Sequence, residues 1–122
     1  MKLLATVAWW ISAIGGCAQT IAFTMPNTEE LSVSVYVDGR PTAQCEIAPG
    51  SERHGKLTSW LAQNKQDWKA SPADFAPKLL VSGKAFSINF VGSFVALNSE
   101  AGQYVHSVEP NQYEFLLCEK RT

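Results

Sequence analysis

Two histidines and a set of scattered carboxylates are the side chains of this 122-residue chain that could move protons. His106 alternates with Tyr104 and Val108, and an imidazole titrates near neutral pH, so His106 could act as a base or as a metal ligand. His54 stands near Glu52 and is expected to be solvated. A metal site needs three or four ligands at workable spacing, and these isolated residues predict neither a metal nor another cofactor.

Motifs of known reactions are not evident in the sequence. Ser93 follows Gly92 in a turn-like stretch, and Gly83 stands in another, so neither has the context of a nucleophile elbow. The glycine at position 50 lacks the further glycines and the lysine of a phosphate-binding loop. The chain therefore offers no catalytic set, although carboxylates brought near His106 by the fold would make it a small hydrolase-like enzyme.

The first 17 residues, MKLLATVAWWISAIGGC, are organised like an export signal. Lys2 precedes an apolar run at 3–14, and two glycines and a cysteine follow this run. The run is too short to cross a bilayer as a mature helix, which needs about 20 residues. We therefore expect the protein to be exported.

Residues 14–17, Ile-Gly-Gly-Cys, resemble the lipobox of bacterial lipoproteins. The resemblance implies that Cys17 is lipidated, becomes the new N-terminus and holds the protein on a membrane through more than one acyl chain. Ala18 and Gln19 are not a retention signal under this resemblance, which implies the outer membrane or the periplasmic side of a Gram-negative envelope. The alternatives are secretion after cleavage before Gln19 and an uncleaved anchor.

Cys45 and Cys118 remain when Cys17 is either lipidated or removed with the signal. Two cysteines in an oxidising compartment have one intramolecular pairing, which predicts a disulfide between them. Two buried free thiols are the alternative. Because Cys45 lies on the apolar face of a predicted strand and Cys118 ends the apolar run 115–117, both are expected to reach one core.

The charge balance argues against nucleic acid as a partner. The whole chain has a formal net charge of −1, and removal of residues 1–17 takes away Lys2 alone and lowers it to −2. Phosphate contacts need clustered lysine and arginine, and no such cluster is seen along the chain.

The predicted fold is α+β, with one helix packed on an antiparallel sheet in the order β-β-α-β-β-β-β. Residues 18–30 are expected to be a flexible tether, and residues 31–122 a single small domain. Apolar and polar residues alternate cleanly in 31–38, and Asp38-Gly39 is typical of a hairpin turn. The expected strands are 31–38, 42–47, 78–82, 85–91, 94–98 and 103–108, and 113–118 is a final strand or helical turn.

A single helix is predicted at 51–66. Ser51 can cap its first turn, and Leu57, Trp60 and Leu61 recur at helical spacing on one face. We expect this face to pack on the sheet, while residues 69–77, which contain two prolines, form a loop.

Aromatic side chains supply the candidate binding surface. Most aromatics of so small a domain belong in its core. Trp68 and Phe75, however, flank the proline-containing loop, and Tyr104 and His106 share one face of a predicted strand. We therefore expect Trp68, Phe75, Tyr104 and His106 to be candidates for a surface that binds a partner.

These observations favour an exported lipoprotein whose domain is a non-catalytic binding or interaction module. Its expected partners are the membrane, through the lipid on Cys17, and an envelope protein or glycan whose identity the sequence does not give. The competing functions are a small periplasmic enzyme that uses His106, a structural component of the envelope, and an inhibitor of an extracellular enzyme.

Overall fold

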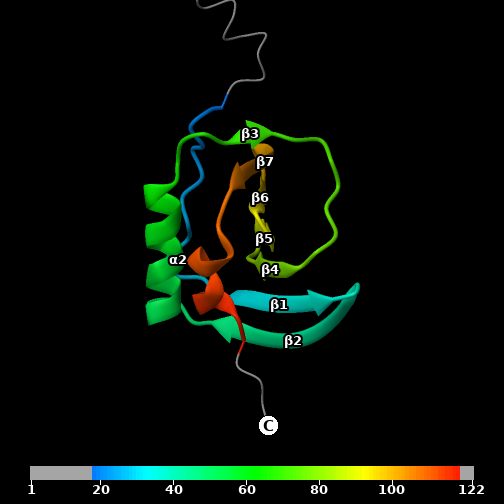
Figure 1. Ribbon diagram of the computed structural model, residues 1–122. Coiled ribbons are helices and arrows are strands. Elements are labelled where there is room, and N and C mark those ends of the chain that lie inside the picture. The colour runs from blue at the N-terminus through cyan, green and yellow to red at the C-terminus, as the bar shows by residue number, and fades with distance from the viewer. Residues whose placement is uncertain (1–17, 119–122) are drawn as a thin grey trace, which may run out of the picture.

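A computed structural model describes residues 18–118 of the protein. Within these residues, one α-helix crosses one face of a seven-stranded sheet, which confirms the predicted α+β fold (Figure 1). All strand pairs are antiparallel, and the strand order across the sheet is β2-β1-β4-β5-β6-β7-β3. The strands are β1 Leu31–Val37, β2 Arg40–Ile47, β3 Lys69–Ala70, β4 Leu79–Ser82, β5 Ser87–Val91, β6 Phe94–Ser99 and β7 Gly102–Ser107.

The β1–β2 hairpin forms where the alternating pattern predicts it. Leu31 and Val33 are fully buried on the face that meets the helix. Asp38 and Gly39 both have positive φ, 53° and 79°, which is the backbone of a tight two-residue hairpin turn. The register pairs Val33 with Cys45, so the first cysteine of the predicted disulfide faces the core.

The helix α2, Glu52–Gln63, covers the sheet with the face predicted from its spacing. Ser51 caps it by accepting a hydrogen bond from the His54 backbone N–H at 3.3 Å. Leu57, Trp60 and Leu61 are buried against the strands. The helix ends three residues earlier than predicted.

His54 does not lie in solvent as expected. Its side chain is buried, and its Nε2 atom lies 3.0 Å from the Pro26 carbonyl oxygen. The reason is that residues before β1 pack over the first turn of α2, and the sequence around His54 contains no sign of this cover.

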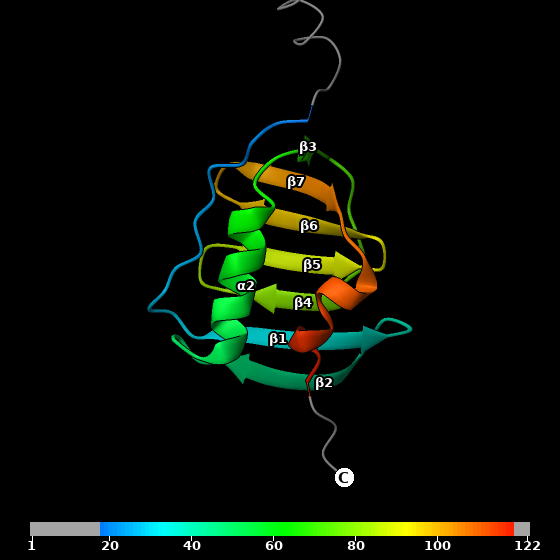
Figure 2. The same cartoon turned by 60° about the vertical axis from the view of Figure 1, so that its left-hand side comes forward.

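The segment before β1 is part of the fold and not a flexible tether. Gln19 pairs with Trp68 through two backbone hydrogen bonds, and the side chains of Ile21 and Met25 are buried. Glu29 then accepts a hydrogen bond from the Lys84 backbone N–H in the β4–β5 turn. Figure 2 shows this segment, in blue, running beside α2 and past the ends of the strands. The domain described by the structure therefore begins before residue 31.

Two further elements differ in detail from the prediction. β3, Lys69–Ala70, lies in the stretch expected to be a loop, and it pairs with Val105 and Tyr104 of β7 at the sheet edge. A strand of two residues is too short to show a period of two. The chain after β7 forms two 3₁₀ turns, η1 Pro110–Gln112 and η2 Glu114–Leu116, which lie beside α2 on the same face of the sheet (Figure 2).

Candidate binding pocket and the disulfide site

A pocket of about 570 Å³ lies between the N-terminal segment and the ends of the central strands, and we call it the N-terminal pocket. One wall is the extended chain from Gln19 to Phe23, and the opposite wall is formed by the β6–β7 hairpin and by Ala85 in the β4–β5 turn. Most of its side chains are apolar. Its lining residues are Gln19, Thr20, Ile21, Ala22, Phe23, Ala85, Leu97, Ser99, Glu100, Ala101 and Tyr104.

The pocket exists because the N-terminal segment is fixed at both ends. Reciprocal hydrogen bonds between Gln19 and Trp68 hold its start, with N···O distances of 2.7 and 3.0 Å. Phe23 packs against Phe86 with ring centroids 4.9 Å apart and so holds the other end against the sheet. The chain between Gln19 and Phe23 lies across the pocket from Leu97, whose buried side chain forms the floor of the pocket.

Tyr104 is the one predicted surface residue that lines this pocket. It is half-buried, and its hydroxyl donates a hydrogen bond to the Ala101 carbonyl oxygen at 3.4 Å. Leu97 stands directly opposite Tyr104 in the β6–β7 register, so the two side chains share one face. The phenol therefore places a polar group within a mainly apolar wall.

His106 lines a different hollow, although it shares a face of β7 with Tyr104. This second hollow has a volume of about 480 Å³, and Ala18, Asp67 and Lys69 also line it. The His106 ring packs on the Trp68 ring with centroids 5.0 Å apart, and its Nδ1 atom lies within hydrogen-bond distance of the Ser107 carbonyl oxygen.

Trp68 lies in the core, so its assignment to a binding surface is wrong. Its exposed fraction is 0%, and its indole N–H donates to the Asn64 carbonyl oxygen. Trp60 packs edge-on against it at 6.3 Å, and the backbone pairing with Gln19 closes the remaining side. Burial here follows from the N-terminal segment, whose pairing with Trp68 no local sequence pattern indicates.

Phe75 lies on the other face of the sheet from the pocket. Its ring meets Phe94 at 4.8 Å. Phe94 precedes Val95, which pairs with Phe90 on the helix face, and neighbouring residues of a strand point to opposite faces. The four predicted surface residues therefore do not form one site.

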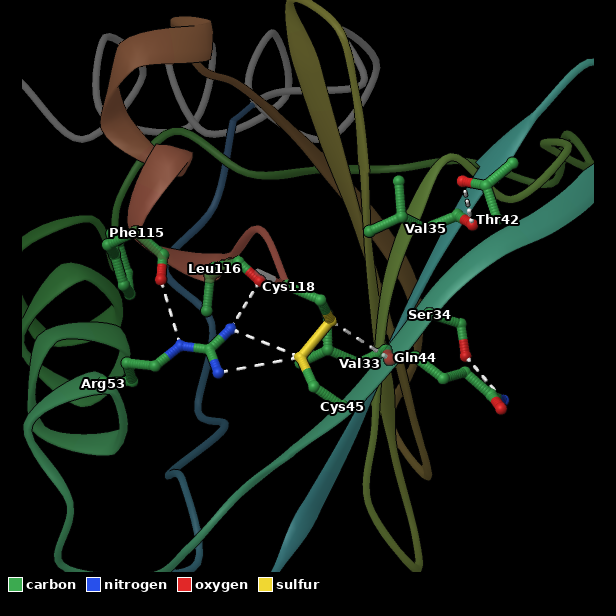
Figure 3. Close-up of a disulfide and its surroundings, with 10 residues drawn as sticks. All are labelled: Val33, Ser34, Val35, Thr42, Gln44, Cys45, Arg53, Phe115, Leu116 and Cys118. Carbon is green, nitrogen blue, oxygen red and sulfur yellow. Dashed lines mark hydrogen bonds between the residues drawn. A yellow bond between two sulfur atoms is a disulfide. The ribbon is translucent and has the colours of Figure 1, made fainter. Parts of the chain in front are cut away.

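The predicted disulfide between Cys45 and Cys118 is present, with the two Cα atoms 5.7 Å apart. Arg53 of α2 reaches the same place (Figure 3). Its Nε donates to the Phe115 carbonyl oxygen at 3.1 Å and its Nη2 to the Leu116 carbonyl oxygen at 2.6 Å, and both Nη atoms lie 3.6 Å from Sγ of Cys45. The disulfide and Arg53 thus join the helix α2, the β1–β2 hairpin and the C-terminal turns at one place.

Cys17, the predicted lipidation site, lies outside the described residues. Within residues 18–118, no cluster of three or more histidine, cysteine or acidic side chains could hold a metal ion. The same part of the chain contains no helix that is long and apolar enough to span a membrane.

The sequence contains a local signal for this pocket wall, although residues 18–30 are predicted to be a tether. Ile21, Phe23 and Met25 recur at every second position, which is the period of a half-buried extended chain. Ile21 and Met25 are indeed buried and Phe23 is half-buried. No sequence pattern identifies Leu97, at the floor of the pocket, or Ala101, at its rim. These two residues lie opposite the N-terminal segment only because of where the β6–β7 hairpin sits in the fold.

No protein-family model matches the chain, and comparisons with curated proteins and with solved structures also give no match.

Proposed function

We propose that this chain is an exported lipoprotein of the bacterial envelope and that its domain is a non-catalytic binding module for a small apolar or amphipathic molecule. The N-terminal pocket carries the binding role. Its volume of about 570 Å³ falls within the range of about 300–1,000 Å³ that is usual for small-molecule sites. A mainly apolar wall with a few polar groups, such as the Tyr104 hydroxyl, is the usual composition of such sites.

Two independent features support the export of the protein. The N-terminal sequence ends in a lipobox-like Ile-Gly-Gly-Cys, and the disulfide Cys45–Cys118 is of a kind that persists in oxidising compartments. Lipidation of Cys17 would hold the domain at the outer membrane or on the periplasmic side of the envelope. Cleavage before Gln19 would instead release it.

The charge of the pocket limits the chemistry of its ligand. Among the described residues that line the pocket, Glu100 carries a charge, and none is a lysine or an arginine. An anionic group on a ligand would be repelled by the Glu100 carboxylate and would find no positively charged side chain among these lining residues. The pocket therefore favours a neutral or zwitterionic molecule with an apolar body, and it disfavours a simple carboxylate or phosphate.

Metabolic labelling with a palmitate analogue tests the lipid anchor. The wild-type protein should take up the label, and Cys17→Ser should take up none, because the acyl acceptor is missing. Wild-type protein that is exported but carries no label would contradict the lipoprotein assignment.

Binding of a neutral apolar dye, Nile red, tests the pocket. Ala101→Phe places a ring in the pocket wall and should weaken dye binding at least ten-fold. Ala62→Phe is the matched control, because Ala62 is exposed on α2 and is not among the lining residues. Equal dye affinity in the two variants would contradict the assignment of this pocket as the binding site.

A further inference from the structure

The fold begins two residues after the proposed lipid anchor. The Gln19 backbone N–H donates to the Trp68 carbonyl oxygen at 2.7 Å, and the Trp68 N–H donates back to Gln19 at 3.0 Å. The Ile21 N–H then donates to the Lys65 carbonyl oxygen at 2.9 Å, and the Ile21 side chain is buried. From Gln19 onward, the chain is therefore held by the domain.

Ala18 is the whole spacer between Cys17 and this first pairing. Two residue steps span at most about 7 Å of extended chain. A flexible linker of about 20 glycine and serine residues would by comparison reach about 25 Å on average. A domain anchored through so short a spacer cannot tumble freely above the lipid headgroups.

We propose that the domain docks on the lipid surface in one orientation, with its β3–β7 edge toward the headgroups. This inference rests on the lipidation of Cys17 proposed above. The docked edge consists of Ala18, Gln19 and the neighbouring Asp67, Lys69 and Ala70. Asp67, Lys69 and Ala70 are exposed. Opposite charges on Asp67 and Lys69 suit a zwitterionic headgroup layer, where each can meet a charge of opposite sign.

The sheet fixes which part of the domain points away from the membrane. β3 and β2 form the two opposite edges of the seven-stranded sheet, and at about 4.8 Å for each strand spacing they stand up to about 29 Å apart. Figure 1 shows the two edges at opposite ends of the molecule. Arg40 on β2 is exposed and should therefore lie well away from the lipid.

The same orientation gives the N-terminal pocket its source of ligand. Gln19 and Thr20 form its wall at the docked edge, so this end of the pocket stands beside the headgroups. A neutral or zwitterionic amphiphile that leaves the bilayer surface would meet the pocket without crossing bulk water.

Single-cysteine labelling of the full lipoprotein in phosphatidylcholine vesicles tests this orientation. Lys69→Cys and Arg40→Cys form a matched pair, because each replaces an exposed basic residue of an edge strand. The native cysteines are occupied by the lipid and by the Cys45–Cys118 disulfide, so a thiol-reactive dye reports the new position alone. The quencher is a nitroxide carried on a fraction of the phosphatidylcholine headgroups.

Dye at position 69 should be quenched at least three-fold more strongly than dye at position 40. Ala70→Cys is a second reporter on β3 and should behave like Lys69→Cys. Insertion of 20 glycine and serine residues after Ala18 should abolish the difference between positions 69 and 40. Equal quenching at both edges in protein that carries the palmitate label would overturn the docked orientation and leave the lipoprotein assignment standing. Absence of the label at Cys17 would overturn the anchor itself.

Discussion

Replacement of both bridging cysteines, Cys45→Ala with Cys118→Ala, should lower the free energy of unfolding by about 4 kcal/mol. The two residues are 73 positions apart. In the chain-entropy account, a cross-link that closes a loop of this length restricts the unfolded ensemble by an amount worth roughly 4 kcal/mol at 25 °C. For a small domain with a total stability of about 5–15 kcal/mol, this is a large share.

The native state of this variant should stay close to the wild type. Arg53 still bonds the Phe115 and Leu116 carbonyl oxygens, and the Leu116 side chain is fully buried in the core. The C-terminal turns therefore keep their own contacts with α2 and the sheet. The loss of stability should accordingly arise in the unfolded state and not from undocking of residues 109–118.

Urea denaturation of residues 18–122, followed by tryptophan fluorescence, measures this effect. With an m-value of about 1.5 kcal/mol/M, the midpoint should fall by about 2.5–3 M. Wild-type protein that has been reduced and alkylated serves as the control and should unfold near the same urea concentration as the double variant. A loss below about 1 kcal/mol in both samples would refute the argument from loop closure.

Three further changes and one control variant test the packing around α2 by the same measurement. Trp60→Ala should cost about 3 kcal/mol or more, because its buried ring packs on Phe90 at 5.6 Å; an unchanged midpoint would place this ring outside the core. Arg53→Met should cost about 2 kcal/mol through two lost charge-assisted hydrogen bonds, whereas Lys56→Met, which removes the exposed ion pair with a neighbouring helix residue, should change stability by less than about 0.5 kcal/mol. Ser51→Ala should cost about 1 kcal/mol by removing the helix cap, and retention of full stability would show that the cap contributes nothing.

Local patterns of apolar residues predicted most of the sheet and the helix. Such a pattern arises because one face of each element is buried, so the pattern identifies both the element and its buried face. β1 alternates because one face is buried, and Leu57, Trp60 and Leu61 recur at helical spacing because one stripe of α2 meets the strands. The disulfide was predicted from composition and from the expected compartment, since Cys45 and Cys118 have one pairing after Cys17 is set aside. None of these inferences needed to know which distant segments meet.

The amino-acid sequence was therefore sufficient to predict an α+β domain with one helix and the pairing of two cysteines, both of which the structure confirms. The packing of distant segments places residues 19–25 against the core, buries Trp68 and His54, and leaves a pocket beneath the N-terminal segment. The physical reason is separation along the chain. Gln19 meets Trp68 across nearly fifty residues. The alternation at 21, 23 and 25 indicates an extended, half-buried segment, but a local period does not identify the distant residues on which that segment packs.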